Sequence, residues 1–235
     1  EKEVAPAGAS VGSDGAAGMS EDVRAELVGG RLDATARAMG ELLGRVALST
    51  NVKERLDYSC ALLDARGRLV VSAPHIPVHL GALGVCVRRV AGAVEMRPGD
   101  VVITNHPAYG GSHLPDITLV APAHDGAGRL IGYAACRAHH ADVGGTRPGS
   151  MPPEATRLEE EGVVIPPRVL VRDGVTDWTG VRGMLEGAKH PARRVEDNLA
   201  DLAAQIAAVG MGVNGLAALA KGEGAASLER GMRAV

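Results

Sequence analysis

The sequence predicts an α+β fold in which an antiparallel sheet packs against amphipathic helices and carries long ordered loops. Apolar residues recur at helical spacing along two long segments, near residues 28–46 and 199–219. Short apolar segments between residues 101 and 138 follow one another through tight turns, which favours antiparallel pairing. A parallel βαβ arrangement is disfavoured because a single predicted helix separates the strands. Apolar residues make up 46% of the chain, which is enough for a sizeable core.

The chain is expected to form one domain with short appendages. Residues 1–20 are rich in Ala, Gly and Ser without periodicity, and they predict a disordered leader. Residues 21–220 form the predicted α+β domain. Residues 221–235, with Leu228 and Met232, predict the start of a truncated helical segment.

The first half of the domain is predicted to be a helix, a hairpin and a second helix. Ser20 is a suitable N-cap for a helix whose apolar face comprises Val28, Leu32, Thr35, Met39, Leu42 and Val46. Residues 55–72 predict two strands joined at Asp64–Gly67. A rigid segment, His75-Ile-Pro-Val-His79, leads to a helix with apolar residues from Leu83 to Val94, and Pro98-Gly99 ends it.

The second half is predicted to hold three strands, a long loop and a helix. The strands are Val101–Thr104, Ile117–Ala123 and Arg129–Ala138. Five prolines between residues 145 and 168 predict an extended ordered loop. From Asn198 a long apolar face predicts a helix, which Gly210, Gly212 and Gly215 weaken towards its end.

Composition excludes several classes of function. Aromatic residues make up 2% of the chain and the formal net charge is −3, which argues against stacking on bases and against binding a phosphate backbone. No apolar run is expected to reach the length of a membrane span, and the first residues do not have the apolar segment of a signal peptide, so a cytoplasmic protein is expected. Cys60, Cys86 and Cys136 are expected to be buried, reduced thiols.

Residues 104–153 carry the chemistry, because they hold five of the eight histidines, placed where strands end. Asp116 and Asp142 each follow a histidine by three residues, His113 and His139 respectively. His113 and Asp116, with a third ligand from residues 139–142, could form a two-histidine, one-carboxylate metal site. Adjacent strand residues point to opposite faces, so either His139 or His140 is the ligand, and the sequence leaves the choice open.

Other residues of this segment are candidates for further roles in the site. Asp142 could be a fourth ligand, a partner of a ligand histidine or a base. His106 is a candidate for substrate contact. Gly144 and Gly145 permit close approach of a ligand to the backbone, and Arg147 could bind a carboxylate or lie at the surface. Alternatively, these residues hydrogen-bond the loops to one another, and this structural interpretation is favoured for His75 and His79. Neither a P-loop nor a dinucleotide-binding pattern is present, so this chain alone is not expected to bind ATP.

Several motifs together resemble the hydantoinase B/oxoprolinase family. The motifs are Asn51-Val-Lys-Glu-Arg-Leu-Asp57, His75-Ile-Pro-Val-His79, Gly110-Gly-Ser-His-Leu-Pro-Asp116, His139-His-Ala-Asp-Val-Gly-Gly145, Pro148-Gly-Ser-Met-Pro-Pro153 and Asn198 with Asp201-Leu-Ala-Ala-Gln205. Asn105-His106-Pro107 is more similar to 5-oxoprolinases. The resemblance implies a partner of hydantoinase A type that binds ATP and activates a small cyclic amide, while the B-type part completes ring opening.

The resemblance also implies a manganese-like ion with ligands at His113, Asp116 and a histidine of the 139–140 pair. Mixed nitrogen and oxygen donors leave the divalent metal open among Mn, Zn and Fe. On this hypothesis His113, Asp116 and His139 hold the metal. Either Asp142 or His140 moves the proton, and the amides of Gly144 and Gly145 stabilise the oxyanion. Family members are longer than this chain, so a separate chain carrying the C-terminal half is a further expected partner. The alternatives are a subunit of acetone- or acetophenone-carboxylase type and a non-catalytic module that binds a small ligand.

Overall fold

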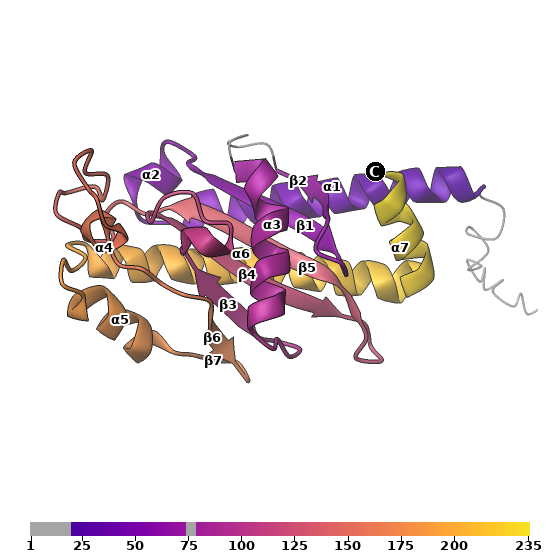
Figure 1. Ribbon diagram of the computed structural model, residues 1–235. Helices are drawn as coiled ribbons and strands as arrows, with labels where there is room; N and C mark the ends of the chain where they lie inside the picture. The colour runs from indigo at the N-terminus through magenta and orange to yellow at the C-terminus, as the bar shows by residue number, and fades with distance from the viewer. Residues whose placement is uncertain (1–19, 74–78) are drawn as a thin grey trace, which may run out of the picture.

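The computed structural model describes residues 20–73 and 79–235, and these contain a seven-stranded antiparallel sheet (Figure 1). The strand order is β2-β1-β5-β4-β3-β6-β7, and every neighbouring pair is antiparallel. The strands are β1 Tyr58–Asp64, β2 Leu69–Ser72, β3 Val101–Thr104, β4 Asp116–His124, β5 Leu130–His139, β6 Arg168–Arg172 and β7 Val175–Thr176. The predicted α+β class with an antiparallel sheet is therefore confirmed.

Helices cover both faces of this sheet. Figure 1 shows α1 (Glu21–Val46) and α6 (Val195–Glu223) running side by side behind the sheet, with α3 (Leu80–Ala93) on the opposite face. The shorter helices are α2 Thr50–Lys53, α4 Leu158–Glu161, α5 Trp178–Gly187 and α7 Ala225–Ala234, together with the 3₁₀ turn η3, Pro107–Tyr109. Ser20 caps α1 as predicted, because its side chain accepts a hydrogen bond from the amide of Val23.

The two faces of the sheet contribute to two separate hydrophobic cores. Along β5, Ala134, Cys136 and Ala138 belong to the larger core with α1 and α6. Tyr133 and Ala135 belong to a smaller core with α3. This alternation follows from the two-residue period of a strand. All three cysteines are buried and free, as predicted.

Some elements differ from the expectation. The predicted loop 145–168 contains the short helix α4, and it is followed by the hairpin of β6 and β7, which the sequence did not predict. Val46, at the end of α1, is exposed rather than part of the buried face. Residues 1–19 and His75 lie outside the described residues, so the predicted leader stays a prediction.

Helix α6 corrects the expectation about apolar runs. Within the described residues, its length and composition alone would allow it to cross a membrane, with a mean hydropathy of 1.6 over 18 residues. Core helices of soluble proteins pass the same test, so this is weak evidence. Leu202, Val209 and Leu216 of α6 are fully buried in the larger core, which accounts for the apolar sequence.

The glycines of α6 do not end the helix, which runs to Glu223, and Gly212 allows close packing. A Cβ atom added to Gly212 would lie 2.6 Å from Sδ of Met39 in α1 and 2.7 Å from Cβ of Ala134 in β5. A Cβ atom added to Gly210 would have no neighbour within 4 Å. Gly212 therefore lies where two helices and the sheet meet.

Gly212→Ala should destabilise the fold by about 1–3 kcal/mol because the added methyl group overpacks this contact. Gly210→Ala, two residues away in the same helix, should instead stabilise it by about 0.5–1 kcal/mol through helix propensity. Urea unfolding of both variants measures the difference. Stabilisation by both substitutions would contradict the close approach of α6 to α1 and β5.

Candidate metal centre

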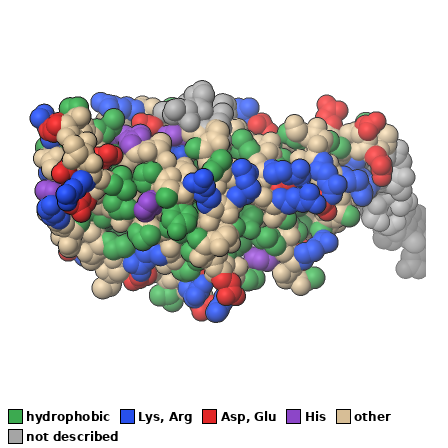
Figure 2. Space-filling model, viewed as in Figure 1, with side chains coloured by type: hydrophobic (Ala, Val, Ile, Leu, Met, Phe, Trp, Pro, Cys, Tyr) green, Lys and Arg blue, Asp and Glu red, His purple; other side chains and the backbone are tan. Residues whose placement is uncertain are grey.

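The predicted ligands meet at one end of β4 and β5. Asp116 is the first residue of β4 and His139 the last residue of β5, and the two are direct partners in the antiparallel register. His113 lies in the turn before β4, where its carbonyl accepts a hydrogen bond from the amide of Asp116. Strand pairing therefore fixes two of the three side chains relative to each other. Figure 2 shows several histidines at the surface on the α3 side of the molecule, near the end where α2 and α4 lie.

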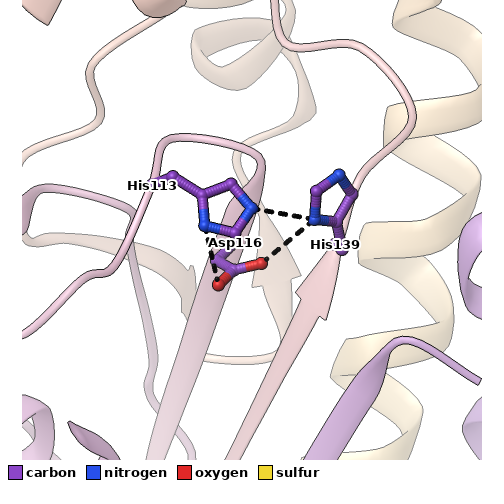
Figure 3. A group of neighbouring side chains, drawn as sticks. All are labelled: His113, Asp116 and His139. Carbon is purple, nitrogen blue, oxygen red and sulfur yellow. Dashed lines mark hydrogen bonds and ion pairs between the residues drawn. The ribbon is translucent and has the colours of Figure 1, made fainter. Parts of the chain in front are cut away.

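The three side chains point towards one another (Figure 3). Nε2 of His113 lies 2.9 Å from Nδ1 of His139, and the latter lies 3.4 Å from Oδ1 of Asp116. One possible ligand atom from each residue falls within 4.8 Å of the other two. Two imidazole nitrogens and a carboxylate oxygen in such a cluster are a suitable donor set for a divalent cation. The structure thus brings His113 and Asp116 together with His139 rather than His140.

Asp116 is fully buried and its two oxygens have different environments. Oδ2 accepts a hydrogen bond from the hydroxyl of Ser112 and lies 3.2 Å from Nε2 of His79. Oδ1 has no hydrogen-bond partner among the described residues, although a buried polar atom without one is costly. Burial opposes ionisation, but interactions with His139, His79 and Ser112 outweigh it and hold the pKa of Asp116 well below its usual range. Oδ1 is therefore a charged oxygen available to a cation.

His113 connects the cluster with the surface, since about a third of its side chain is exposed. Burial lowers the pKa of His113 below its ordinary value of 6.5, and the nearby Asp116 only partly opposes this effect. A lowered pKa favours the neutral imidazole, which is the form that binds metals.

Two side chains that lie beside this cluster, His79 and Asp57, were not predicted to be near it. His79, for which the sequence favours a role in holding loops together, is buried and lies beside Asp116. Asp57 places Oδ2 3.7 Å from Nδ1 of His139. It directly precedes β1, which pairs with β5 so that Tyr58 lies opposite Ala138. The sequence does show both residues within motifs, but their proximity depends on strand pairing and on the placement of α3.

His140 lies on the opposite face of the sheet from the cluster. Its ring nitrogens lie 3.2 Å from Oδ1 of Asn198 and 3.0 Å from Oε1 of Gln205, both in α6. The amide nitrogens of these two residues donate in turn to the carbonyls of Asp142 and Ile117. His140 thus links α6 to the ends of β4 and β5, and the structure gives it no contact with the three clustered side chains.

Asp142 organises the loop that follows β5. Its carboxylate accepts hydrogen bonds from the amides of Gly144, Gly149 and Arg193, and it forms a 3.0 Å ion pair with the guanidinium of Arg193. Burial opposes ionisation of Asp142, but these backbone hydrogen bonds and Arg193 lower its pKa. The contacts are those of a carboxylate that holds a loop together.

The remaining predicted residues also have partners within the chain. The amide of Gly144 donates to Asp142 and that of Gly145 to the carbonyl of His190, so neither is free for an oxyanion. Arg147 is exposed and paired with Glu154. His106 accepts a hydrogen bond from the amide of Ala108 at the start of η3 and packs edge-on against Tyr109. The structure does not bring these four residues into contact with the cluster.

A buried arginine next to the cluster was not predicted. Arg137 lies two residues before His139 in β5 and is fully buried. It donates to the hydroxyl of Thr118 and to the carbonyl of Gly110, in the segment that leads to His113. The signal that the sequence does contain is a single charged residue within the otherwise apolar segment 130–138.

Comparison with known proteins identifies the family of the chain. Residues 21–235 match the sequence pattern that defines the family described as Hydantoinase B/oxoprolinase. The chain belongs to the hydantoinase B/oxoprolinase family. It is 45% identical to the 5-oxoprolinase of Saccharomyces cerevisiae over 84% of this chain and 16% of that protein. It is 44% identical to 5-oxoprolinase 1 of Arabidopsis thaliana, over 90% of this chain and 17% of that protein.

Solved structures of similar proteins have the same fold. The ATP-dependent caprolactamase from Pseudomonas jessenii matches with a TM-score of 0.81 and 28% identity, over 92% of this chain and 37% of that chain. An acetone carboxylase structure matches with a TM-score of 0.81 at 21% identity, over 92% of this chain and 28% of that chain, and this likeness shows the fold alone. The chain spans about a sixth of the length of the 5-oxoprolinases and about a third of the length of these structures.

Proposed function

We propose that this chain is the B-type part of an ATP-dependent hydrolase of cyclic amides, with 5-oxoproline as the first substrate to test. The observation that carries the proposal is the cluster of His113, Asp116 and His139 at the joined ends of β4 and β5. Similarity to 5-oxoprolinases over most of this chain supports the choice of substrate class. The similarity to a protein named caprolactamase subunit beta, at 35% identity, supports the action of the chain as one part of a larger enzyme.

The residues of the cluster fit a divalent cation. Asp116 would offer Oδ1, which accepts no hydrogen bond from the described residues, and His113 and His139 would each offer a ring nitrogen. Mixed nitrogen and oxygen donors suit Mn, Zn or Fe. When bound, such an ion would polarise a carbonyl group or lower the pKa of a water molecule.

The residue proposed to transfer a proton differs from the residues predicted from the sequence. Asp142 and His140, proposed from the sequence, contact other parts of the chain. Asp57 is a second carboxylate beside His139, and about a quarter of its side chain is exposed. Asp57 therefore replaces them as the group proposed to exchange a proton with the substrate or with water.

The partners follow from the same proposal. ATP would be bound by a partner of hydantoinase A type, which would activate the amide before ring opening. The residues C-terminal to this domain in longer relatives would be supplied by a further segment or chain. His113, the exposed member of the cluster, marks the side from which the activated substrate would approach.

The experiment is reconstitution of this chain with a partner of hydantoinase A type and with a chain that carries the C-terminal half of the B-type part. Phosphate release from ATP and ring-opened product are measured with 5-oxoproline, hydantoin and ε-caprolactam, and a parallel reaction contains acetone and bicarbonate. Coupled opening of a cyclic amide is the expected result. Consumption of the ketone and bicarbonate without amide hydrolysis would replace the proposal with a carboxylase. A protein that neither retains metal nor turns over any substrate would instead be a binding module.

A further inference from the structure

We infer that His79 is a positioning residue that orients the carboxylate of Asp116 for cation binding and is not itself a ligand. This inference rests on the proposed metal centre. His79 directly precedes α3 and is 2% exposed. Its Nε2 lies 3.2 Å from Oδ2 of Asp116, and its Nδ1 lies 3.2 Å from the hydroxyl oxygen of Ser59 in β1. The ring thus connects α3 to two strands of the sheet.

The hydrogen-bond partners determine which ring nitrogen carries the proton. An ionised carboxylate is only an acceptor, so Nε2 must donate to Oδ2 of Asp116. In the neutral ring Nδ1 is then an acceptor, and the Ser59 hydroxyl can donate to it. A ring nitrogen that carries a proton has no lone pair for a metal. The group of His113, Asp116 and His139, whose ligand atoms lie within 4.8 Å of one another, also does not include His79, although His79 lies close to Asp116.

The contacts of Asp116 explain how His79 orients the carboxylate. Ser112 and His79 both approach Oδ2, from the loop before β4 and from the start of α3. Donors on one oxygen hold the carboxyl group against rotation and leave Oδ1 directed towards His139, 3.4 Å from its Nδ1. Ligand carboxylates in metal sites are commonly held by such hydrogen bonds.

A purely structural role in α3 does not account for the ring. His79 is the N-cap residue of α3, but its side chain makes no capping hydrogen bond to that helix. The two polar contacts of the ring described above are instead to side chains of the sheet, Ser59 and Asp116. The imidazole acts on the candidate metal centre and not on the end of the helix.

The test compares the binding of Mn(II) and Co(II) to the full chain and to single variants. His79→Leu should weaken binding by about 10–100-fold and change the visible absorption of bound Co(II), because the carboxylate loses one of its two supports. His79→Gln should bind within about threefold of the unmodified chain, since its amide nitrogen can donate in place of Nε2. His124→Leu, at the other end of β4, is the matched control and should leave binding unchanged.

The outcomes distinguish the inference from the metal centre itself. Asp116→Asn is measured in parallel, and if it abolishes binding while His79→Leu does not, the positioning role is wrong and the metal centre stands. If Asp116→Asn also binds normally, the metal centre and the inference both fail. Equal loss in His79→Leu and His79→Gln, with circular dichroism spectra unchanged, would make His79 a ligand. Rescue by Gln together with a restored Co(II) spectrum supports the inference.

Discussion

Asp116→Asn should weaken the binding of Mn(II) or Co(II) by more than about 100-fold, beyond the effect of losing an outer hydrogen bond. Ser112 and His79 both direct donors at Oδ2, so the oxygen of the new amide should take that position. The amide nitrogen would then occupy the place of Oδ1, beside His139. An amide NH₂ group has no lone pair to offer, so the cluster would lose its oxygen ligand. Isothermal titration calorimetry with Mn(II) and with Co(II) measures the change in affinity.

Asp142→Asn is the matched control because Asp142 is also a buried aspartate with a lowered pKa. This substitution removes the ion pair with Arg193 and should lower stability while metal affinity remains. In the reconstituted enzyme, Asp116→Asn should abolish ATP-coupled ring opening. An equal loss of metal from both variants would mean that disruption of the fold, rather than loss of a ligand, explains the result.

Gly144→Ala should destabilise the domain by about 3 kcal/mol or more, from backbone strain and overpacking together. Gly144 has φ +93°, a conformation that glycine adopts without penalty. An added Cβ atom would lie 2.2 Å from the carbonyl oxygen of His190. That oxygen accepts the amide of Gly145, so it cannot move away without breaking a hydrogen bond.

Gly149→Ala separates the cost of backbone strain from the cost of overpacking. Gly149 has a similar φ of +83°, but an added Cβ atom would have no neighbour within 4 Å. Its substitution should cost about 1 kcal/mol, the strain term alone. Guanidinium unfolding of both variants gives the comparison. If Gly144→Ala were no less stable than Gly149→Ala, the close approach of Gly144 to the carbonyl of His190 would be contradicted.

Local patterns in the sequence were sufficient for the fold class, for most of the longer elements and for part of the site. Apolar periodicity and turn residues placed α1, α3, β3, β4 and β5 close to their observed bounds, because these signals lie within single elements. The pair His113 and Asp116 was recognisable because both residues share one short loop. The choice of His139 over His140 required the register of β4 with β5, which the sequence does not contain.

The misplaced roles have a common physical origin. His140 and Asp142 are close to His139 in sequence, but the alternation of β5 sends His140 to α6, and Asp142 turns towards the following loop. In contrast, Asp57 and His79 are distant in sequence and reach the cluster through β1 and α3. Neighbours across strands depend on long-range pairing, which composition and spacing do not encode.

Two of the three donors of the candidate centre, Asp116 and His139, lie on paired strands, and the two hydrophobic cores include none of the three. The protein should therefore fold before any ion arrives, unlike small zinc domains, which need the metal to fold. Loading would be a late event through the partly exposed His113, and ions that favour similar donors would compete for the same place. Metal availability in the cell, as much as the protein, would then decide which element is bound.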